Sequence, residues 1–393
     1  MSSRQPPHST SPSPTSTSSP GPGGRLPDAA DGLALIKPLV RSQPGYSLAA
    51  AEARHKLNQN ESPLDFPPEL KQEVLDRALV LPWQRYPAFT PRDLQESIAA
   101  RYGWVPDGVI VGNGSNELIQ ATLGVSLGGD DVVVAPSPTF SLYRLITGVL
   151  GGRYVPVPLS ESFHFDVPRL IETARREQAR VIVLNSPNNP TGSALPSGAV
   201  EQLLDETNAL ILCDEAYQDF GGPSSLQELS RSSRVVVLRT FSKAFGLAGL
   251  RFGFALAHPA VAEEIAKGKL PYNVNLITLA AAKVALRHAA ALAARVEELI
   301  DVRERFLADL RRLPGLVVYP TAANFVLVRC VALPASDVFQ RLHQQHGILV
   351  RDVSGAPGLA ECLRISIGTA EDMAAVIRAL DEILSGRHKS RGV

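Results

Sequence analysis

The sequence lacks a surplus of either charge, a cysteine pattern and any long apolar run. Lys and Arg number 39, as do Asp and Glu, so no net field favours nucleic acid or an anionic membrane. The three cysteines, Cys213, Cys330 and Cys362, are far apart and show no metal-binding or redox spacing, so we expect a reduced, cytoplasmic protein with no metal site. No apolar run approaches the roughly 18–20 residues that span a bilayer, and the N-terminus lacks a secretory apolar stretch.

The first 24 residues contain little that could form a core, because 20 of them are Ser, Thr, Pro or Gly. Such a segment buries too little apolar surface to offset the entropy lost on ordering. We therefore expect residues 1–45 to be a disordered Ser/Pro-rich tail and an N-terminal arm. Ordered structure should begin between Asp28 and Tyr46.

Short, uniformly apolar runs alternate with helix-like stretches from about residue 70 to residue 272. This alternation predicts a mostly parallel sheet that is covered by helices on both faces. The expected strands are residues 109–111, 131–135, 180–185, 210–214, 235–240 and 251–257. Helices expected between them include residues 116–125, 167–178 and 198–206.

After residue 272 the pattern changes, and a chain of 393 residues is long enough for a second domain. A long helical stretch over 276–313 precedes expected strands at 325–329, 348–352 and 362–367 and helices at 335–346 and 370–384. The predicted fold class is α/β, with a large domain around a mostly parallel sheet plus a smaller α+β C-terminal domain. We place the large domain at 70–285 and the small domain at 46–69 plus 286–393.

A glycine-rich segment, residues 112–117 (GNGSNE), follows the first expected strand and opens a helix. Glycine lets the backbone approach an anion closely, and a helix N-terminus offers free N–H groups. Gly114, Ser115 and Asn116 are therefore candidates for holding a phosphate. An ordinary turn followed by a helix capped by Ser or Asn is the alternative.

Two polar segments follow the next strands. In residues 185–192 (NSPNNPTG), two prolines and a glycine fix a rigid loop in which Asn189 would present its amide to a ligand oxygen. In residues 214–217 (DEAY), Asp214 ends an apolar strand, where a carboxylate is costly to bury without a partner, and Tyr217 would face the same way. A plain turn and a helix-capping aspartate are the respective alternatives.

Cationic residues also interrupt apolar segments. Lys243 lies among apolar residues just after the strand at 235–240, and a buried lysine loses its charge readily and becomes a nucleophile. Arg251, eight residues later, offers a donor fork that suits phosphate. Arg351 and Arg364 lie within apolar strands and need partners. The alternatives are a lysine that reaches solvent and arginines that form internal ion pairs, for example with Asp352 or Glu361.

Taken together, these segments resemble the signature of fold-type I, pyridoxal-phosphate-dependent aminotransferases, over roughly residues 46–384. Within that superfamily the sequence is most similar to histidinol-phosphate aminotransferases. The segments that carry this similarity are 56–63 (KLNQNESP), 85–87 (RYP), 242–251 (SKAFGLAGLR), 271–274 (PYNV), 323–325 (ANF) and 363–369 (LRISIGT). The sequence departs from the family in its long tail and in Phe140, where the family often has a tyrosine.

The resemblance implies roles for these residues. Lys243 would hold the aldehyde of pyridoxal 5'-phosphate (PLP) as a Schiff base and move the substrate proton, and Asp214 would keep the ring nitrogen protonated. Tyr217 and Asn189 would bind the phenolic oxygen. Phe140 would stack on the ring. The residues that would hold the phosphate are Gly114, Ser115, Asn116, Thr240, Ser242 and Arg251.

The resemblance also implies a homodimer with shared active sites, because Tyr86 would reach the cofactor phosphate of the neighbouring subunit. Asn60, Asn324, Arg351 and Arg364 would bind the substrates, a small-molecule amino donor and a 2-oxo acid. We expect these to be L-histidinol phosphate and 2-oxoglutarate, in histidine biosynthesis.

Three other functions were weighed. An aromatic amino-acid aminotransferase on the same scaffold is the nearest alternative, since the motifs barely separate the two substrates. A decarboxylase of phosphorylated amino acids fits residues 242–251 less well. A regulator built on the same fold needs a DNA-binding domain, for which residues 1–45 are too short and too rich in Pro and Ser. Neither a nucleic-acid nor a membrane partner is expected.

Overall fold

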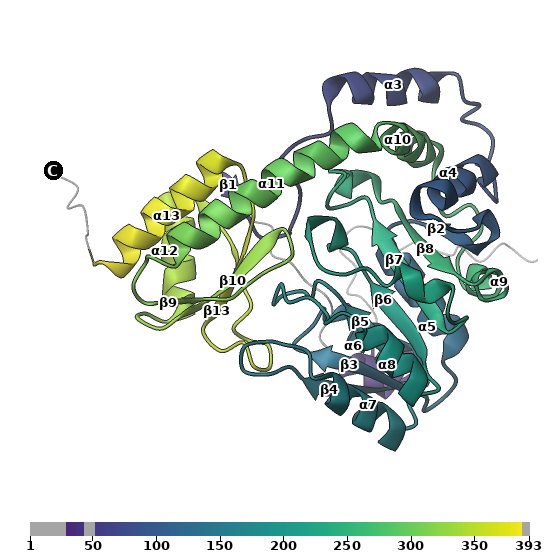
Figure 1. The fold of residues 1–393 in the computed structure, drawn as a ribbon, viewed down its shortest axis with the longest axis horizontal. Coiled ribbons are helices and arrows are strands. Elements are labelled where there is room, and N and C mark those ends of the chain that lie inside the picture. Colours follow the sequence, from purple (N-terminus) through teal and green to yellow (C-terminus); the bar gives the residue numbers. More distant parts are fainter. Residues whose placement is uncertain (1–28, 43–51, 387–393) are drawn as a thin grey trace, which may run out of the picture. The chain divides into compact units, whose positions relative to one another are not determined.

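A seven-stranded sheet is the largest element of the computed structural model, which describes residues 29–42 and 52–386 (Figure 1). In spatial order its strands are β2 (Val109–Gly112), β8 (Gly253–Ala257), β7 (Val235–Thr240), β6 (Leu210–Asp214), β5 (Val181–Asn185), β3 (Val132–Ser137) and β4 (Arg153–Pro158). Neighbouring strands are parallel except in the two pairs that include β8. The parallel strands therefore end at one edge of the sheet.

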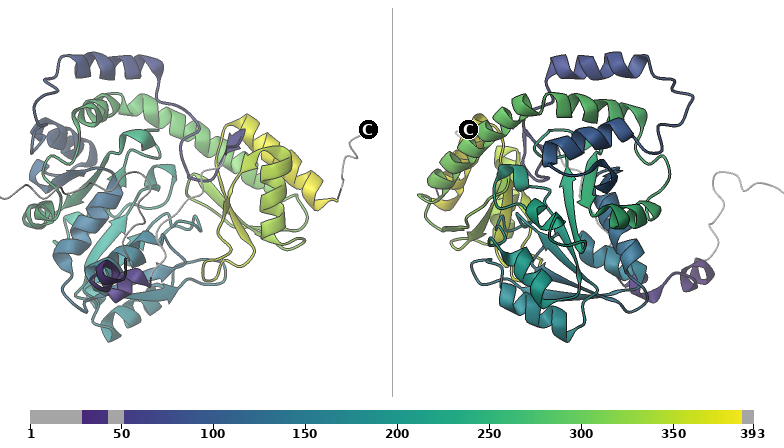
Figure 2. Two further views of the ribbon diagram at one scale, coloured as in Figure 1. Left: turned by 180° about the vertical axis from the view of Figure 1, so that it is seen from behind. Right: turned by 45° about the vertical axis from the view of Figure 1, so that its right-hand side comes forward.

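Helices cover both faces of this sheet because successive side chains of each strand point to opposite faces. In β5, Val181 and Val183 join one buried apolar cluster, whereas Ile182 and Leu184 join the other. The first face is covered by α5 (Ser115–Ser126), α6 (Leu142–Leu150) and α9 (Pro259–Lys267). On the second lie α4 (Arg92–Tyr102), α7 (Val167–Arg176), α8 (Ala199–Glu206) and α10 (Leu276–Arg287). Helix α3 (Pro68–Leu79) packs on the outside of α10, as two further views show (Figure 2).

A second, antiparallel sheet with its own apolar core lies toward the C-terminus. Its strands are, in order, β12 (Arg351–Asp352), β13 (Cys362–Ser366), β10 (Phe325–Cys330) and β9 (Leu316–Val318). The helices beside it are α11 (Ala289–Leu310), α12 (Ala335–His346) and α13 (Ala370–Leu384). The early strand β1 (His55–Lys56) pairs in parallel with β11 (Ile348–Leu349) in a separate two-stranded sheet. The residues that follow β1 are attached to the C-terminal sheet, because the carbonyl of Leu57 and the N–H of Asn60 both bind Ser366 of β13. The domain boundaries proposed above remain a prediction.

Residues 29–42 form a separate unit with two short helices, α1 (Ala30–Ala34) and α2 (Pro38–Arg41). The rest of the predicted tail and arm, residues 1–28 and 43–45, lies outside the described residues. Over the described ranges, no single helix is long and apolar enough to cross a bilayer. The pair α10 and α11 meets that requirement only in combination, and it is bent by 79°.

The structure corrects two predicted elements. The stretch over 276–313 is divided at His288, whose ring nitrogen Nε2 lies 2.9 Å from Glu73 of α3, while Arg287 also pairs with Glu73. This tertiary contact anchors the break. The predicted strand over 348–352 is two short strands in different sheets.

Strand β4 was not predicted because Pro156 and Pro158 lack the N–H group that a central strand needs. The structure places it at the edge of the sheet, where a missing donor is tolerated. The helices α3, α4, α6 and α9 were not predicted either.

Helix α13 depends on a reciprocal cap at its N-terminus. The Thr369 hydroxyl accepts a bond from the Asp372 N–H, and the Asp372 carboxylate accepts one from the Thr369 N–H. Substituting Thr369→Ala should lower the free energy of unfolding by about 1 kcal/mol. Urea unfolding checks this, with Ser336→Ala on α12 as a control, since Ser336 caps no helix. Equal losses in the two variants would contradict the role of the cap.

Candidate active site

A cavity of about 740 Å³ lies where the carboxyl ends of the parallel strands face the four-stranded sheet. Ligands of open parallel sheets bind at this edge. Thirteen of the predicted site residues line it, namely Asn60, Ser115, Asn116, Phe140, Asn189, Asp214, Tyr217, Thr240, Ser242, Lys243, Arg251, Arg351 and Arg364. The sequence therefore identified residues that the fold brings to one place from both sheets.

Three predicted residues do not line the cavity. Gly114 lies just behind its wall, since a Cβ there would be 2.4 Å from Nη2 of Arg251. Asn324 is buried and donates its amide to the carbonyl of Asn60 at 3.1 Å. Tyr86 is 80% exposed and stacks on Tyr272 at 4.6 Å, on the surface of the chain.

Lys243 is half-buried in the cavity wall, and its amine donates to the carbonyl oxygen of Gln59 at 3.0 Å. Desolvation, with the nearby charges of Arg364 and Arg251, lowers the pKa of Lys243 to about 7. A large share of the amine is therefore neutral at neutral pH. The neutral form is the nucleophile that the sequence predicted.

Asp214 ends β6 and is 3% exposed. Its Oδ1 accepts a bond from the N–H of Ala216 at 3.1 Å, and its Oδ2 accepts one from the hydroxyl of Tyr143 at 2.6 Å. Burial raises the pKa of Asp214, and the two donors oppose that rise. Nothing in the sequence singled out Tyr143, which looks like one more aromatic core residue of α6.

Two side chains from the C-terminal sheet and the 185–192 loop meet at another part of the wall. Arg364 donates to Oδ1 of Asn189 at 2.6 Å and to the carbonyl of Asn58 at 2.7 Å. Because Oδ1 of Asn189 is engaged, its Nδ2 is the end of the amide left to donate to a ligand. The neighbouring Tyr217 hydroxyl accepts a bond from Asn60 at 3.1 Å.

The glycine-rich segment forms an anion cradle together with the segment that follows β7. Helix α5 starts at Ser115 after Gly114, whose φ of +80° favours glycine. The guanidinium of Arg251 donates to Oγ of Ser242 at 3.1 Å. A Cβ on Gly253 would lie 2.5 Å from the N of Ser115, so glycine there lets β8 approach the start of the helix.

Three cationic residues of the cavity, Lys243, Arg251 and Arg351, do not form the internal ion pairs that were the alternative, since none of the ion pairs within the described ranges includes them. Glu361, the alternative partner for Arg351, instead accepts a bond from the N–H of Ala335 at 2.5 Å. The cradle therefore suits a phosphate, and Arg351 and Arg364 suit a second anionic group.

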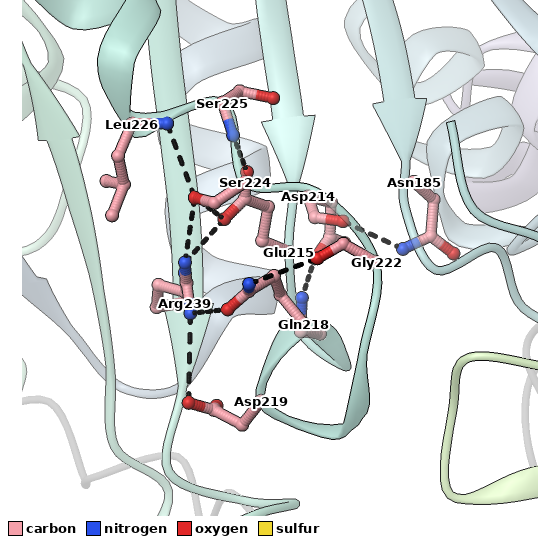
Figure 3. A network of polar contacts seen from close by, with 11 residues as sticks. Asn185, Asp214, Glu215, Gln218, Asp219, Gly222, Ser224, Ser225, Leu226 and Arg239 are labelled. Carbon is pink, nitrogen blue, oxygen red and sulfur yellow. Dashed lines mark hydrogen bonds and ion pairs between the residues drawn. The ribbon is translucent and has the colours of Figure 1, made fainter. Parts of the chain in front are cut away.

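A buried polar network lies behind Asp214 (Figure 3). Nη2 of Arg239 lies 2.7 Å from Oε2 of Glu215, and both side chains are almost fully buried. Arg239 also donates to Gln218 at 2.6 Å and to Ser224 at 3.0 Å. Glu215 follows Asp214 and Arg239 precedes Thr240, so the network joins β6 to β7 beside the cavity. The sequence did not single out this pair.

Comparison with known proteins gives the family. The family model for aminotransferases of class I and II matches residues 54–380. The chain belongs to the class I and II aminotransferases. A histidinol-phosphate aminotransferase from Chlorobaculum tepidum is 37% identical to this aminotransferase over 84% of the chain and 95% of that protein. Histidinol-phosphate aminotransferase 2 from Bordetella parapertussis is 38% identical over 88% and 95%.

A crystal structure of histidinol-phosphate aminotransferase from Sinorhizobium meliloti in complex with pyridoxal-5'-phosphate matches with a TM-score of 0.80 and 27% identity. That match covers 90% of this chain and 98% of the other. The predicted family and fold class of this aminotransferase are thus confirmed. The roles of the individual residues stay predictions.

The lowered pKa of Lys243 predicts unusual reactivity. Reductive methylation of the protein should reach its plateau rate at Lys243 above about pH 7, because the amine is then neutral. At the exposed Lys267, whose pKa is raised by a hydrogen bond to Glu264, the rate should keep rising through pH 10. Peptide mass spectrometry measures both sites in one sample. Parallel profiles at the two lysines would contradict the assignment.

Proposed function

We propose that this aminotransferase binds PLP and transfers an amino group between L-histidinol phosphate and 2-oxoglutarate in the cytoplasm. One observation carries the proposal. The amine of Lys243 lies within electrostatic reach of both Arg251, in the phosphate cradle, and Arg364, at the opposite sheet. The cavity thus offers one anion site to the cofactor and another to the substrate.

PLP supplies an aldehyde that captures amines and a protonated ring that withdraws electrons from the substrate Cα. The residues present fit that group. The cavity is lined by a buried carboxylate, Asp214, which would face a protonated ring nitrogen, and by Lys243, whose amine is partly neutral near pH 7. Phe140 provides an aromatic face, and Nδ2 of Asn189 provides a donor for a ring oxygen.

Proton transfer is assigned to Lys243. With PLP bound, the free amine of Lys243 would take the proton from the substrate Cα and deliver it to the former aldehyde carbon of the cofactor, and it would move a proton in the opposite direction during the reverse half-reaction. A lysine with an ordinary pKa would be protonated near pH 7 and could not accept that proton. The pKa of about 7 matches the task, because both protonation states are populated at working pH.

The substrate assignment combines the cavity with the relatives. Histidinol phosphate carries a phosphate and no α-carboxylate, whereas glutamate carries two carboxylates, so one pocket must bind each anion in turn. Arg351 and Arg364 are placed for this. The relatives named histidinol-phosphate aminotransferase favour this reading over an aromatic aminotransferase.

We further propose a homodimer in which Tyr86 contacts the cofactor phosphate of the other subunit. Trp83, Tyr86 and Phe89 are each more than 60% exposed. The ring of Tyr272 stacks on Tyr86 and meets Phe89 edge-on. A cluster of exposed aromatic residues on one surface is typical of a protein interface. The domain division at residues 70–285 is part of the same proposal.

Substituting Asp214→Asn should leave PLP bound but slow the proton-transfer step by about 10²–10⁴. A neutral amide cannot hold the ring proton by charge in a buried site. Single-turnover kinetics with glutamate measures the rate of this step. The variant Lys243→Ala, which lacks the base, gives the baseline rate. Turnover within a few-fold of the unmodified enzyme would refute the role of Asp214.

The donor preference tests the substrate assignment. The value of kcat/KM should be far higher for histidinol phosphate than for phenylalanine. Substituting Arg364→Ala should reduce it for both histidinol phosphate and glutamate by about 10- to 100-fold, because each loses a charge-assisted contact. A clear preference for phenylalanine would overturn the proposed substrate and leave the cofactor proposal standing.

A further inference from the structure

The hydroxyl of Tyr143 is the one side-chain donor to the carboxylate of Asp214 within the described residues. The distance of 2.6 Å between the two oxygens is typical of a hydrogen bond from a hydroxyl to a charged carboxylate. Tyr143 is completely buried and Asp214 nearly so, which leaves bulk water no access to this bond. In a site of low dielectric such a bond is stronger than in water, and losing it is correspondingly costly.

Helix α6 fixes Tyr143 and Phe140 relative to each other. The rings are 5.7 Å apart and nearly perpendicular, and the N–H of Tyr143 donates to the carbonyl of Phe140. The hydroxyl of Thr147 in turn donates to the carbonyl of Tyr143 at 2.7 Å. Phe140 therefore faces the cavity, while Tyr143 lies behind Asp214.

From this geometry we infer that Tyr143 is a positioning residue, which orients the carboxylate of Asp214 and keeps it ionised for a cationic ring nitrogen of the cofactor. The inference rests on the proposed PLP chemistry. Burial raises the pKa of Asp214 and so favours the neutral carboxyl group, and the hydrogen bond from the Tyr143 hydroxyl opposes that rise. Burial also raises the pKa of Tyr143 well above its usual value, so its hydroxyl remains a donor at every working pH.

The orientation of Asp214 follows from the same contacts. Oδ1 is held by the N–H of Ala216 and Oδ2 by Tyr143, so rotation of the carboxylate would break both bonds. A carboxylate fixed at both oxygens keeps its remaining lone pairs toward the cavity, which Asp214 lines. Preorganisation of this kind spares the cost of reorienting the group when a cation binds.

The test is Tyr143→Phe, which keeps the ring and its packing and removes the hydroxyl alone. Without its donor, Asp214 should take up a proton at higher pH. The affinity of the apoenzyme for PLP should therefore fall by about 10- to 100-fold near neutral pH. The acid limb of the affinity-versus-pH profile should also move to higher pH by at least about one unit.

Tyr154→Phe is the matched control. Tyr154, on β4, packs against the same apolar cluster as Tyr143, and within the described part of the chain its hydroxyl makes no hydrogen bond. That variant should keep both the affinity and the pH profile of the unmodified protein.

PLP affinity is measured by titrating each apoprotein and following cofactor absorbance, with the melting temperature of each apoprotein recorded beside it. An unchanged acid limb in Tyr143→Phe, even with a lower melting temperature, would overturn the inference and leave only a packing role. Failure of the unmodified protein to bind PLP would instead refute the proposed function.

Discussion

The buried ion pair between Glu215 and Arg239 fixes the distance between the ends of β6 and β7, on which the cavity depends. It connects the ends of β6 and β7, the strands that lead directly into Asp214 and into Thr240, Ser242 and Lys243. Burying two charges is costly unless each is paired and its remaining hydrogen bonds are satisfied. Gln218, Ser224 and Ser225 supply most of those bonds, while Nε of Arg239 is buried without a hydrogen-bond partner within the described residues. The guanidinium of Arg239 also lies 5.4 Å from the ring centre of Tyr102. The carboxylate of Asp214 and the amine of Lys243 are therefore held by two strands whose ends this buried network joins.

The opposite wall of the cavity belongs to the four-stranded sheet. Arg364 lies on β13, and its two donor groups bind Asn189 from the large sheet and the backbone at Asn58. One side chain thus joins three separate parts of the chain around the ligand space. Any ligand that draws the Arg364 guanidinium toward itself must compete with those two acceptors.

Much of the site was predictable because its residues carry local signals. Asp214 ends, and Lys243 closely follows, a strand that is apolar at nearly every position, and such strands are easy to recognise in a sequence. Tyr143 carries no such signal, since its importance comes from a partner 71 residues away in the chain. Arg239 interrupts an apolar strand as Arg364 does, but the sequence does not show that its buried partner is Glu215. A tyrosine in an apolar helix looks the same whether or not a carboxylate lies above its hydroxyl.

The fold shows the same division between local and tertiary causes. The central strands were recognised to within about two residues, because burial on both faces demands an apolar residue at almost every position. Strand β4 was missed because it contains prolines, which are tolerated only in an edge strand. The sequence does not show which strand lies at the edge of the sheet. The break at His288 depends on Glu73, more than 200 residues away.

The attachment of residues 57–60 to the C-terminal sheet has a consequence for biosynthesis. The N–H of Asn60 binds the hydroxyl of Ser366, 306 residues later in the sequence. A ribosome delivers the N-terminal part of a chain first. Lys243 and Asp214 therefore leave the ribosome well before the strand that completes their surroundings, and the N–H of Asn60 lacks its native acceptor, the Ser366 hydroxyl, until β13 has been made. Translation of almost the whole described chain must precede closure of the ligand space, so a nascent chain that stalls before β13 would expose a reactive amine without its enclosing wall.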